Sequence, residues 1–214
     1  MNARYKIMAV IICAVLLFSI VGYFLIGRIF FDNHEDSTID FTDRTDNTAW
    51  YGYLESNNDS FLYTGSPEKF KENIFSSDNY NTISYSDNQN MLSQTPGYTN
   101  GYPYFLYEIT VLELTTKIKV KYEGYSSQPF IHDVPNEINL FIFNYNTNNW
   151  DQFINKNTDD FDCNISCTIT DNISDYLNNS RINILIVGPY GAGNSTSTLS
   201  CDYFAIINSH TIEE

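Results

Sequence analysis

The pattern of hydrophobic and polar positions changes once along the chain, near residue 30. Residues 7–27 (IMAVIICAVLLFSIVGYFLIG) form one apolar run without a charged side chain. A helix of this length spans roughly 31 Å, which matches the roughly 30 Å hydrocarbon core of a bilayer. The remainder of the chain alternates short apolar runs with turn residues. The pattern therefore predicts a transmembrane helix at residues 7–29 and a strand-rich body at residues 48–210.

One segment of the body has the period-2 alternation of a strand with one wet face. In residues 116–123, three apolar side chains alternate with Lys117, Lys119 and Lys121. We interpret the lysine row as the solvated face of a sheet, where lysine also discourages pairing at an edge. An anion-binding face is the alternative interpretation.

The most apolar strand lies at residues 137–145, and it forms the clearest hairpin with residues 150–154. With about eight to ten short strands and little helix, the body is predicted to be all-β, an antiparallel β-sandwich of the jelly-roll kind. Other expected elements are a short helix at residues 67–75, a single helical turn at 172–177 and a long loop at 78–101.

The charges around the apolar run predict its orientation. Arg4 and Lys6 precede the run, and only Arg28 follows it closely. The positive-inside rule therefore places residues 1–6 in the cytoplasm and the body outside the cell. The run is longer than the core of a signal peptide and ends without an Ala-x-Ala site, so an uncleaved signal-anchor is favoured over a cleaved signal. The predicted location is the plasma membrane, with a single pass and an extracytoplasmic C-terminal domain.

The acidic balance of the chain limits its partners. The net charge is −15, and all 26 acidic side chains follow residue 31. A body of this charge repels nucleic acid, so DNA and RNA are excluded as partners. The acidic segment at residues 30–47 has no periodic pattern, and we predict a stalk between the membrane and the body.

Cysteine usage agrees with an oxidising compartment. Cys163 and Cys167 lie on one predicted strand, about 13 Å apart on the same face, which is too far for a mutual disulfide. Cys201 is then the partner for one of them, and we predict the pair Cys167–Cys201. Zinc is disfavoured because no fourth ligand has a suitable spacing.

A glycine-rich stretch resembles a phosphate-binding loop without completing it. Gly188 and Gly193 have the G-x-x-x-x-G spacing, but Asn194 replaces the lysine that contacts phosphates. The residues that follow are β-branched and aromatic, whereas phosphate binding requires a helix there. We predict a loop between two antiparallel strands and no nucleotide.

Catalytic chemistry has little support, because His132 beside Asp133 has no nucleophile motif nearby. We assign no catalytic residue and predict that the protein is not an enzyme. Asp159, Asp160 and Asp162 are candidate oxygen ligands for Ca²⁺, the one cofactor considered, although a solvated acidic loop is the alternative. Five N-x-S/T sequons mark glycosylation acceptors of a glycoprotein: Asn58, Asn164, Asn172, Asn178 and Asn194.

Four short motifs resemble a known domain. They are YEGYS at residues 122–126, LFIFNYNTNNW at 140–150, ISDYL at 173–177 and STLSCDY at 197–203. In this order, they resemble the galactose-binding-like jelly-roll domain of archaeal and bacterial cell-surface proteins. The resemblance implies framework roles for Trp150, Tyr203, Asp175 and Asp202, and it implies binding or display without catalysis.

The leading functional hypothesis is a membrane-anchored binding or adhesion module for carbohydrate or for a surface protein. Sugar sites stack the apolar face of the ring on aromatic side chains and bind hydroxyls through Asn and Asp. The aromatic candidates are Tyr98, Tyr102, Tyr104 and Trp50, for which ordinary packing is the alternative role. A structural subunit of an envelope or membrane complex that docks a partner protein is the second hypothesis.

Overall fold

The computed structural model describes residues 34–41, 47–55, 65–96, 100–112, 114–128, 136–158, 161–191 and 196–211. Residues 36–210 form one compact unit. The predicted transmembrane helix at residues 7–29 lies outside the described residues. Within the described residues, no helix has the length and apolar character needed to cross a membrane.

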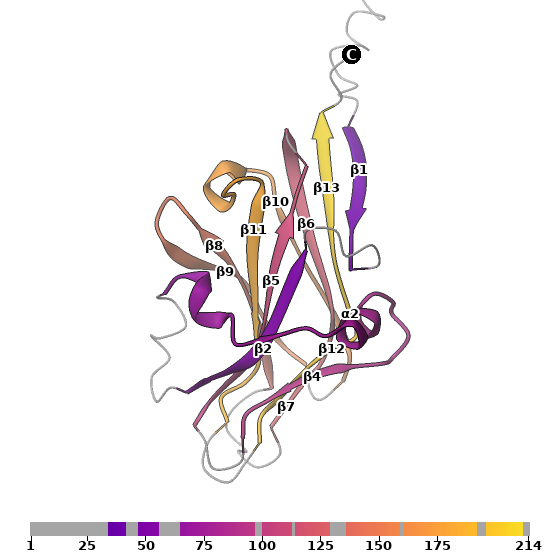
Figure 1. The fold of residues 1–214 in the computed structure, drawn as a ribbon, viewed down its shortest axis with the longest axis vertical. Coiled ribbons are helices and arrows are strands. Elements are labelled where there is room, and N and C mark those ends of the chain that lie inside the picture. Colours follow the sequence, from indigo (N-terminus) through magenta and orange to yellow (C-terminus); the bar gives the residue numbers. More distant parts are fainter. Residues whose placement is uncertain are drawn as a thin grey trace, which may run out of the picture. The chain divides into compact units, whose positions relative to one another are not determined.

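The body consists of three β-sheets, shown in Figure 1. The four-stranded sheet has the order β1 (His34–Ile39), β13 (Tyr203–Thr211), β6 (Thr115–Gly124) and β10 (Cys163–Ile169). The six-stranded sheet has the order β3 (Asn73–Ile74), β2 (Thr48–Glu55), β5 (Gly101–Thr110), β11 (Arg181–Val187), β8 (Glu137–Asn144) and β9 (Asn149–Asn157). The small sheet has the order β4 (Met91–Gln94), β12 (Thr198–Cys201) and β7 (Ser126–Ser127).

Neighbouring strands pair antiparallel, which confirms the predicted antiparallel β-sandwich. The hairpin of β8 and β9 has Asn144 opposite Asn149, as the sequence predicted. On β6, Ile118, Val120 and Tyr122 are buried, so the alternation with lysine is also confirmed. These buried positions belong to the core between the two larger sheets.

An aromatic stack in the core joins the two larger sheets. The rings of Tyr107 on β5 and Phe204 on β13 lie 3.7 Å apart and are nearly parallel, at 9°. The Tyr107 hydroxyl donates to the Cys201 Sγ of the small sheet at 3.3 Å. Phe41 lies beside both rings, with ring centroids at 5.9 and 6.1 Å. Side chains from all three sheets therefore meet at one point of the core.

The six-stranded sheet is apolar on its outer face as well. Phe70 of the 3₁₀-helix η2 (Pro67–Phe70) lies edge-to-face against Tyr104 at 5.3 Å and Trp150 at 5.4 Å. The Trp150 Nε1 donates to the Gly65 carbonyl at 2.9 Å. Because both faces are covered, β5 is buried at nearly every position, without period-2 alternation.

Two elements occupy the segment where a long loop was predicted. Helix α2 (Ser77–Ile83) starts with a capping box, in which Ser76 and Asn79 bind each other's backbone amides. Strand β4 follows it and pairs with β12. The loop prediction at residues 78–101 was wrong here because Asn- and Ser-rich composition also suits caps and edge strands. The predicted helix at 67–75 is shorter, limited to η2.

The predicted helical turn near residue 172 is present as the 3₁₀-helix η3 (Ile173–Tyr176). Asn172 precedes it in the left-handed region, at φ 50°, and its side chain makes no capping hydrogen bond. The Asn172 side chain therefore does not cap this turn. The turn is tied down instead by the Asp175 carbonyl, which accepts from the Tyr145 amide at 2.6 Å.

Part of the predicted stalk at residues 30–47 is a strand. β1 lies at the edge of the four-stranded sheet, beside β13. Ser37 Oγ donates to the Asn208 carbonyl at 3.4 Å, and Ser209 Oγ donates to the Asp36 carboxylate. The sequence pattern missed β1 because these contacts are with a partner strand about 170 residues away in the chain.

The predicted disulfide Cys167–Cys201 is not formed, since Cys163, Cys167 and Cys201 are all free thiols. Cys167 lies on β10 opposite Val120, in the four-stranded sheet. Cys201 lies in the small sheet, where its Sγ accepts from Tyr107. The sequence does not show that Cys167 and Cys201 lie on strands of different sheets, so the predicted pairing was wrong.

The aromatic stack yields a stability prediction. Replacing Phe204 with Ala removes a fully buried ring and leaves a cavity beside Tyr107, so we expect a loss of about 3–5 kcal/mol in the free energy of unfolding. Urea denaturation followed by tryptophan fluorescence measures it. Phe161→Ala is the matched control, because Phe161 is 75% exposed and its removal should cost less than about 0.5 kcal/mol. Equal losses in the two variants would contradict the assigned role of the stack.

The free thiols yield a chemical prediction. Burial raises the pKa of Cys167 to about 12 and raises that of Cys201 as well. Because the thiolate is the reactive form, iodoacetamide should modify both slowly in the folded protein at about pH 8, and faster as the pH rises. In denaturant without reductant, mass spectrometry should find all 4 cysteines of the chain alkylated. A product with two unmodified cysteines would show that a disulfide is present and would contradict the assignment of free thiols.

Candidate functional site

Two of the predicted sugar-stacking residues are packing residues. Tyr104 is fully buried, with its ring against Phe70, and Tyr102 is 7% exposed, with its ring 5.1 Å from Tyr190. Both lie on the covered outer face of β5, which the sequence could not identify as covered. Several other candidate residues from the sequence lie outside the described residues: Tyr98, Asp159, Asp160, Asn58, Asn194 and His132.

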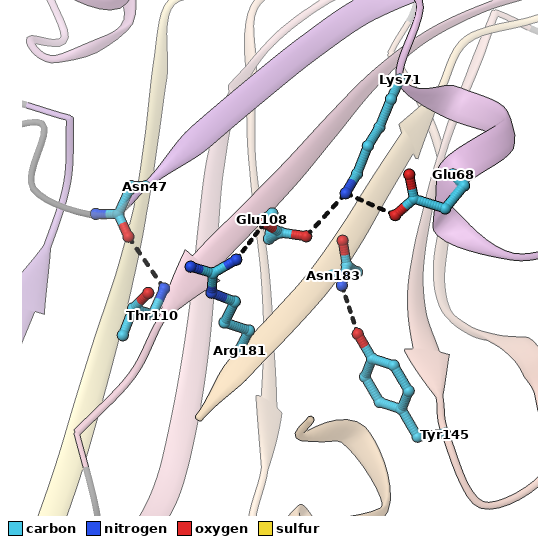
Figure 2. A network of polar contacts seen from close by, with 8 residues as sticks. All are labelled: Asn47, Glu68, Lys71, Glu108, Thr110, Tyr145, Arg181 and Asn183. Carbon is cyan, nitrogen blue, oxygen red and sulfur yellow. Dashed lines mark hydrogen bonds and ion pairs between the residues drawn. The ribbon is translucent and has the colours of Figure 1, made fainter. Parts of the chain in front are cut away.

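Trp50 is half-buried beneath a cation. The Lys71 ammonium lies 4.9 Å from the centre of the indole ring. Figure 2 shows the same ammonium between two carboxylates, at 2.8 Å from Glu68 and 3.1 Å from Glu108. Arg181 binds the other oxygen of Glu108 at 3.1 Å. This charge network (Glu68, Lys71, Glu108 and Arg181) ties η2 to β5 and β11, and it occupies one face of the Trp50 ring.

Lys71 keeps its positive charge within the network. Burial lowers the pKa of Lys71, but the hydrogen bonds and charges of Glu68 and Glu108 outweigh burial and raise it overall. Below the network, Asn183 Nδ2 donates to the Tyr145 hydroxyl at 2.6 Å, as Figure 2 shows. The charges of the network are therefore paired with one another, and we assign the network a structural role.

Of the three predicted calcium ligands, only Asp162 lies within the described residues. Asp162 is exposed there. No group of three or more His, Cys, Asp or Glu side chains among the described residues is arranged to hold a metal ion. Of the predicted glycosylation acceptors, Asn164, Asn172 and Asn178 are exposed.

A hollow of about 340 Å³ lies at one end of the sandwich, where β8, β9, β10 and η3 meet. We call it the rim pocket. Its floor includes the partly buried rings of Phe153 and Tyr176, which lie edge-to-face at 5.6 Å. Polar side chains and the end of β10 complete the wall: Asn144, Thr168, Ile169, Thr170, Asp171, Asn172 and Asp175.

The polar residues at the base of the rim pocket hold one another in place. Asp151 Oδ2 accepts from the Tyr176 hydroxyl at 3.0 Å and from Asn144 Nδ2 at 2.8 Å. Asn144 Oδ1 accepts from the backbone amides of Asn146 and Thr147, at 3.0 and 3.1 Å. Burial and the neighbouring Asp151 raise the pKa of Tyr176, so its hydroxyl stays protonated as a donor. The rings are therefore fixed before any ligand arrives.

The composition of the rim pocket suits a neutral hydroxylated ligand. The two rings offer apolar surface, while the exposed Asp171 and Asn172 and the half-buried Asp175 offer hydrogen-bonding groups. Aromatic rings with a few convergent polar groups are the usual lining of small-molecule sites. Lys, Arg and His are absent from the described lining, so an anionic group finds no counter-charge there.

Sequence reasoning missed the rim pocket. Its residues come from segments that are separated in the chain, and each was interpreted as framework: Phe153 as half of a hairpin and Asp175 as a turn residue. The available signal was Asp171-Asn172 directly before the ISDYL turn, which places polar groups next to Tyr176. The tertiary contact of Tyr176 with Phe153 could not be read from that signal.

Comparisons with solved structures find distant similarities. The xylan-binding module CBM15 shares 11% identity, with 85% of this chain and 100% of that chain covered and a TM-score of 0.42. TmCBM61, in complex with β-1,4-galactotriose, shares 11% identity over 83% and 90% of the two chains, with a TM-score of 0.35. The CBM28 module, specific for non-crystalline cellulose, shares 12% identity over 57% and 75%, with a TM-score of 0.35. Scores this low do not establish a common topology.

The comparison with protein families gives a firmer result. No curated protein matches the chain. The family model that matches is AF_1625_C, described as the C-terminal domain of an uncharacterized protein, and the match covers residues 48–210. These residues include every described element from β2 to the final residues of β13 and contain the rim pocket. The chain belongs to the AF_1625_C family.

Proposed function

We propose that this protein is a non-catalytic carbohydrate-binding module and that the rim pocket binds neutral sugar rings. The observation that carries the proposal is the fixed pair of rings, Phe153 and Tyr176, beside two carboxylates and an amide. The apolar face of a sugar packs on aromatic rings, and its hydroxyls donate to carboxylate oxygens. A hollow of about 340 Å³ lies at the small end of the range for ligand sites, so it takes a short part of a glycan.

The proposal assigns a role to each side chain of the rim pocket that faces solvent. Asp171 and Asp175 accept hydrogen bonds from sugar hydroxyls, and Asn172 both donates and accepts. Asn144 and Asp151 do not contact the ligand, because their hydrogen bonds position Tyr176 and the hairpin. A glycan attached to Asn172 would occupy the same space, so ligand binding and glycosylation of this sequon exclude each other.

We also propose that residues 7–29 anchor this module in the plasma membrane, with the body outside the cell. The apolar run and the basic residues before it support this orientation. A galactose-binding-like jelly roll remains the fold family that the sequence motifs favour. In this arrangement, the module displays its sugar site at the cell surface.

Sugar binding is tested by replacing one ring of the rim pocket. The full-length chain, purified in a polyoxyethylene detergent that contains no sugar, is screened on a glycan array, and its best neutral ligand is measured by calorimetry. Tyr176→Ala should weaken binding by at least about tenfold, because it removes the stacking surface. Tyr176→Phe should retain most of the affinity, because it keeps the ring.

Tyr85→Ala is the matched control, since Tyr85 is 59% exposed and lies outside the rim pocket. We expect it to bind as the unmodified protein does. Circular dichroism confirms that each variant is folded. The proposal is wrong if the protein binds no neutral glycan on the array. It is also wrong if Tyr176→Ala and Tyr85→Ala bind the best neutral ligand with equal affinity.

The membrane proposal is tested in intact cells that express the chain. A protease added outside should degrade the body, because the signal-anchor orientation exposes residues 48–210. An antibody against the C-terminal residues follows the digestion. A body that survives until the cells are lysed would contradict the extracytoplasmic location, and a body released without protease would contradict the anchor.

A further inference from the structure

The lysine row of β6 lies in the middle of a sheet. Lys117, Lys119 and Lys121 project from the outer face of the four-stranded sheet, because the alternate residues of β6 are buried. The sequence indicated the solvated face of a sheet, on which lysine also discourages pairing at an edge. In the structure, β6 pairs with β13 on one side and with β10 on the other. Edge protection therefore does not explain these lysines.

The strands on both sides offer the lysines no opposite charge. On β13, Ser209, Ile207 and Ala205 lie opposite Lys117, Lys119 and Lys121. On β10, the residues opposite Lys119 and Lys121 are Thr168 and Ser166. Opposite charges across a sheet stabilise it, and like charges on one face repel each other. Cross-strand charge pairs therefore do not account for the three lysines, and the acidic residue that shares their face on β6 is Glu123.

The lack of partners contrasts with the rest of the chain. The chain has 26 acidic side chains against 11 basic ones, and yet no ion pair among the described residues includes Lys117, Lys119 or Lys121. Lys71 and Arg181, by comparison, share Glu108. The row is therefore a positive area on a strongly negative body.

The row borders a second hollow. Lys119 and Lys121 line a groove of about 300 Å³, together with Asn164 and Ser166 of β10 and Tyr203 of β13. We call this the lysine groove. Tyr203 is half-buried and offers part of its ring, while Asn164 and Ser166 are exposed. Glu123 also lines the groove, between its cross-strand neighbours Asn164 and Tyr203, so one negative charge lies on the same face as the lysines. Ammonium groups, an amide, a hydroxyl, a carboxylate and an aromatic ring therefore line one hollow.

We propose that the lysine groove binds an acidic polysaccharide, with sugar carboxylates on Lys119 and Lys121, hydroxyls on Asn164 and Ser166, and a ring face on Tyr203. Alternate residues of a strand are roughly 6.7 Å apart, so the lysines present charge at a regular spacing along the groove. A polymer with one carboxylate per sugar has a low charge density, which limits its repulsion from the acidic body. Double-stranded DNA, with one charge per roughly 1.7 Å, does not have that advantage.

This site is separate from the rim pocket, and the two share no lining residue. The rim pocket has carboxylates and no cation, whereas the lysine groove has two cations. The first therefore prefers neutral rings and the second acidic ones. Each site can exist without the other, so the two proposals can fail independently.

The test measures the binding of polygalacturonate to the full-length chain in a polyoxyethylene detergent. We expect binding that weakens strongly between about 50 mM and about 500 mM NaCl, because exposed charges are screened by salt. Fully methyl-esterified polygalacturonate has the same backbone without the charges, and it should bind at least about tenfold more weakly. Equal binding of the two polymers would overturn the proposal.

Single-charge variants locate the binding site. Lys119→Gln and Lys121→Gln should each weaken polygalacturonate binding by about tenfold, because each removes a charge-assisted hydrogen bond. Lys69→Gln removes the same charge from an exposed side chain outside the groove and should leave the affinity unchanged. Circular dichroism checks the fold of each variant. An equal effect of all three variants would show that net charge alone matters, and it would overturn the proposal.

Two further measurements separate the alternatives. Tyr176→Ala should retain full polygalacturonate binding, and a loss in this variant would assign the polymer to the rim pocket instead. Double-stranded DNA of matched length should bind at least about tenfold more weakly than polygalacturonate at about 150 mM NaCl. DNA that binds as tightly would identify a general polyanion surface and would also overturn the proposal.

Discussion

The stack of Tyr107 on Phe204 is the contact on which the rest of the body depends. It joins an interior strand of the six-stranded sheet to an interior strand of the four-stranded sheet, and the Tyr107 hydroxyl reaches Cys201 in the small sheet. Aromatic pairs bury more area than other side-chain pairs and favour defined geometries. The three sheets are therefore held together at this point, while the rim pocket is formed by β8, β9, β10 and η3.

The outer faces of the two larger sheets differ in how they are covered. The six-stranded sheet is covered by η2, which the charge network of Glu68, Lys71, Glu108 and Arg181 ties to β5 and β11 (Figure 2). The Lys71 ammonium also lies over the Trp50 ring. Every charge of the network has a partner in the chain. Among the described residues, the lysines of the four-stranded sheet take part in no ion pair, although acidic side chains are abundant in the chain. This leaves them available for the proposed acidic ligand.

The sequence predicted those parts of the fold in which local pattern and burial agree. β6 has one wet face, so alternation revealed it, and the β8–β9 hairpin has a clear turn. Alternation fails where both faces are buried, which is why Tyr102 and Tyr104 of β5 could not be distinguished from accessible aromatic residues. β1 and α2 were missed because a distant partner strand and a capping box, rather than hydrophobic pattern, stabilise them.

Sites differ from strands in that their residues are brought together only by tertiary structure. Phe153 and Tyr176 are 23 positions apart in the sequence, and their contact depends on the placement of η3 beside β9. The lysine row was visible in the sequence, but its meaning depended on whether β6 was an edge strand. Knowledge of strand order changed the interpretation from protection to binding. Sheet order is set by long-range pairing, which no local window of sequence contains.

One strand connects the two proposed sites. Asn164, Ser166 and Thr168 are successive exposed residues on the same face of β10. The first two line the lysine groove, and Thr168 lines the rim pocket. These three residues span roughly 13 Å of strand, which is within the reach of a short glycan. A single extended polymer that lies along β10 would therefore place an acidic segment on Lys119 and Lys121 and a neutral segment against Tyr176. Simultaneous contact at both sites would raise the affinity by effective concentration, without any further contact surface.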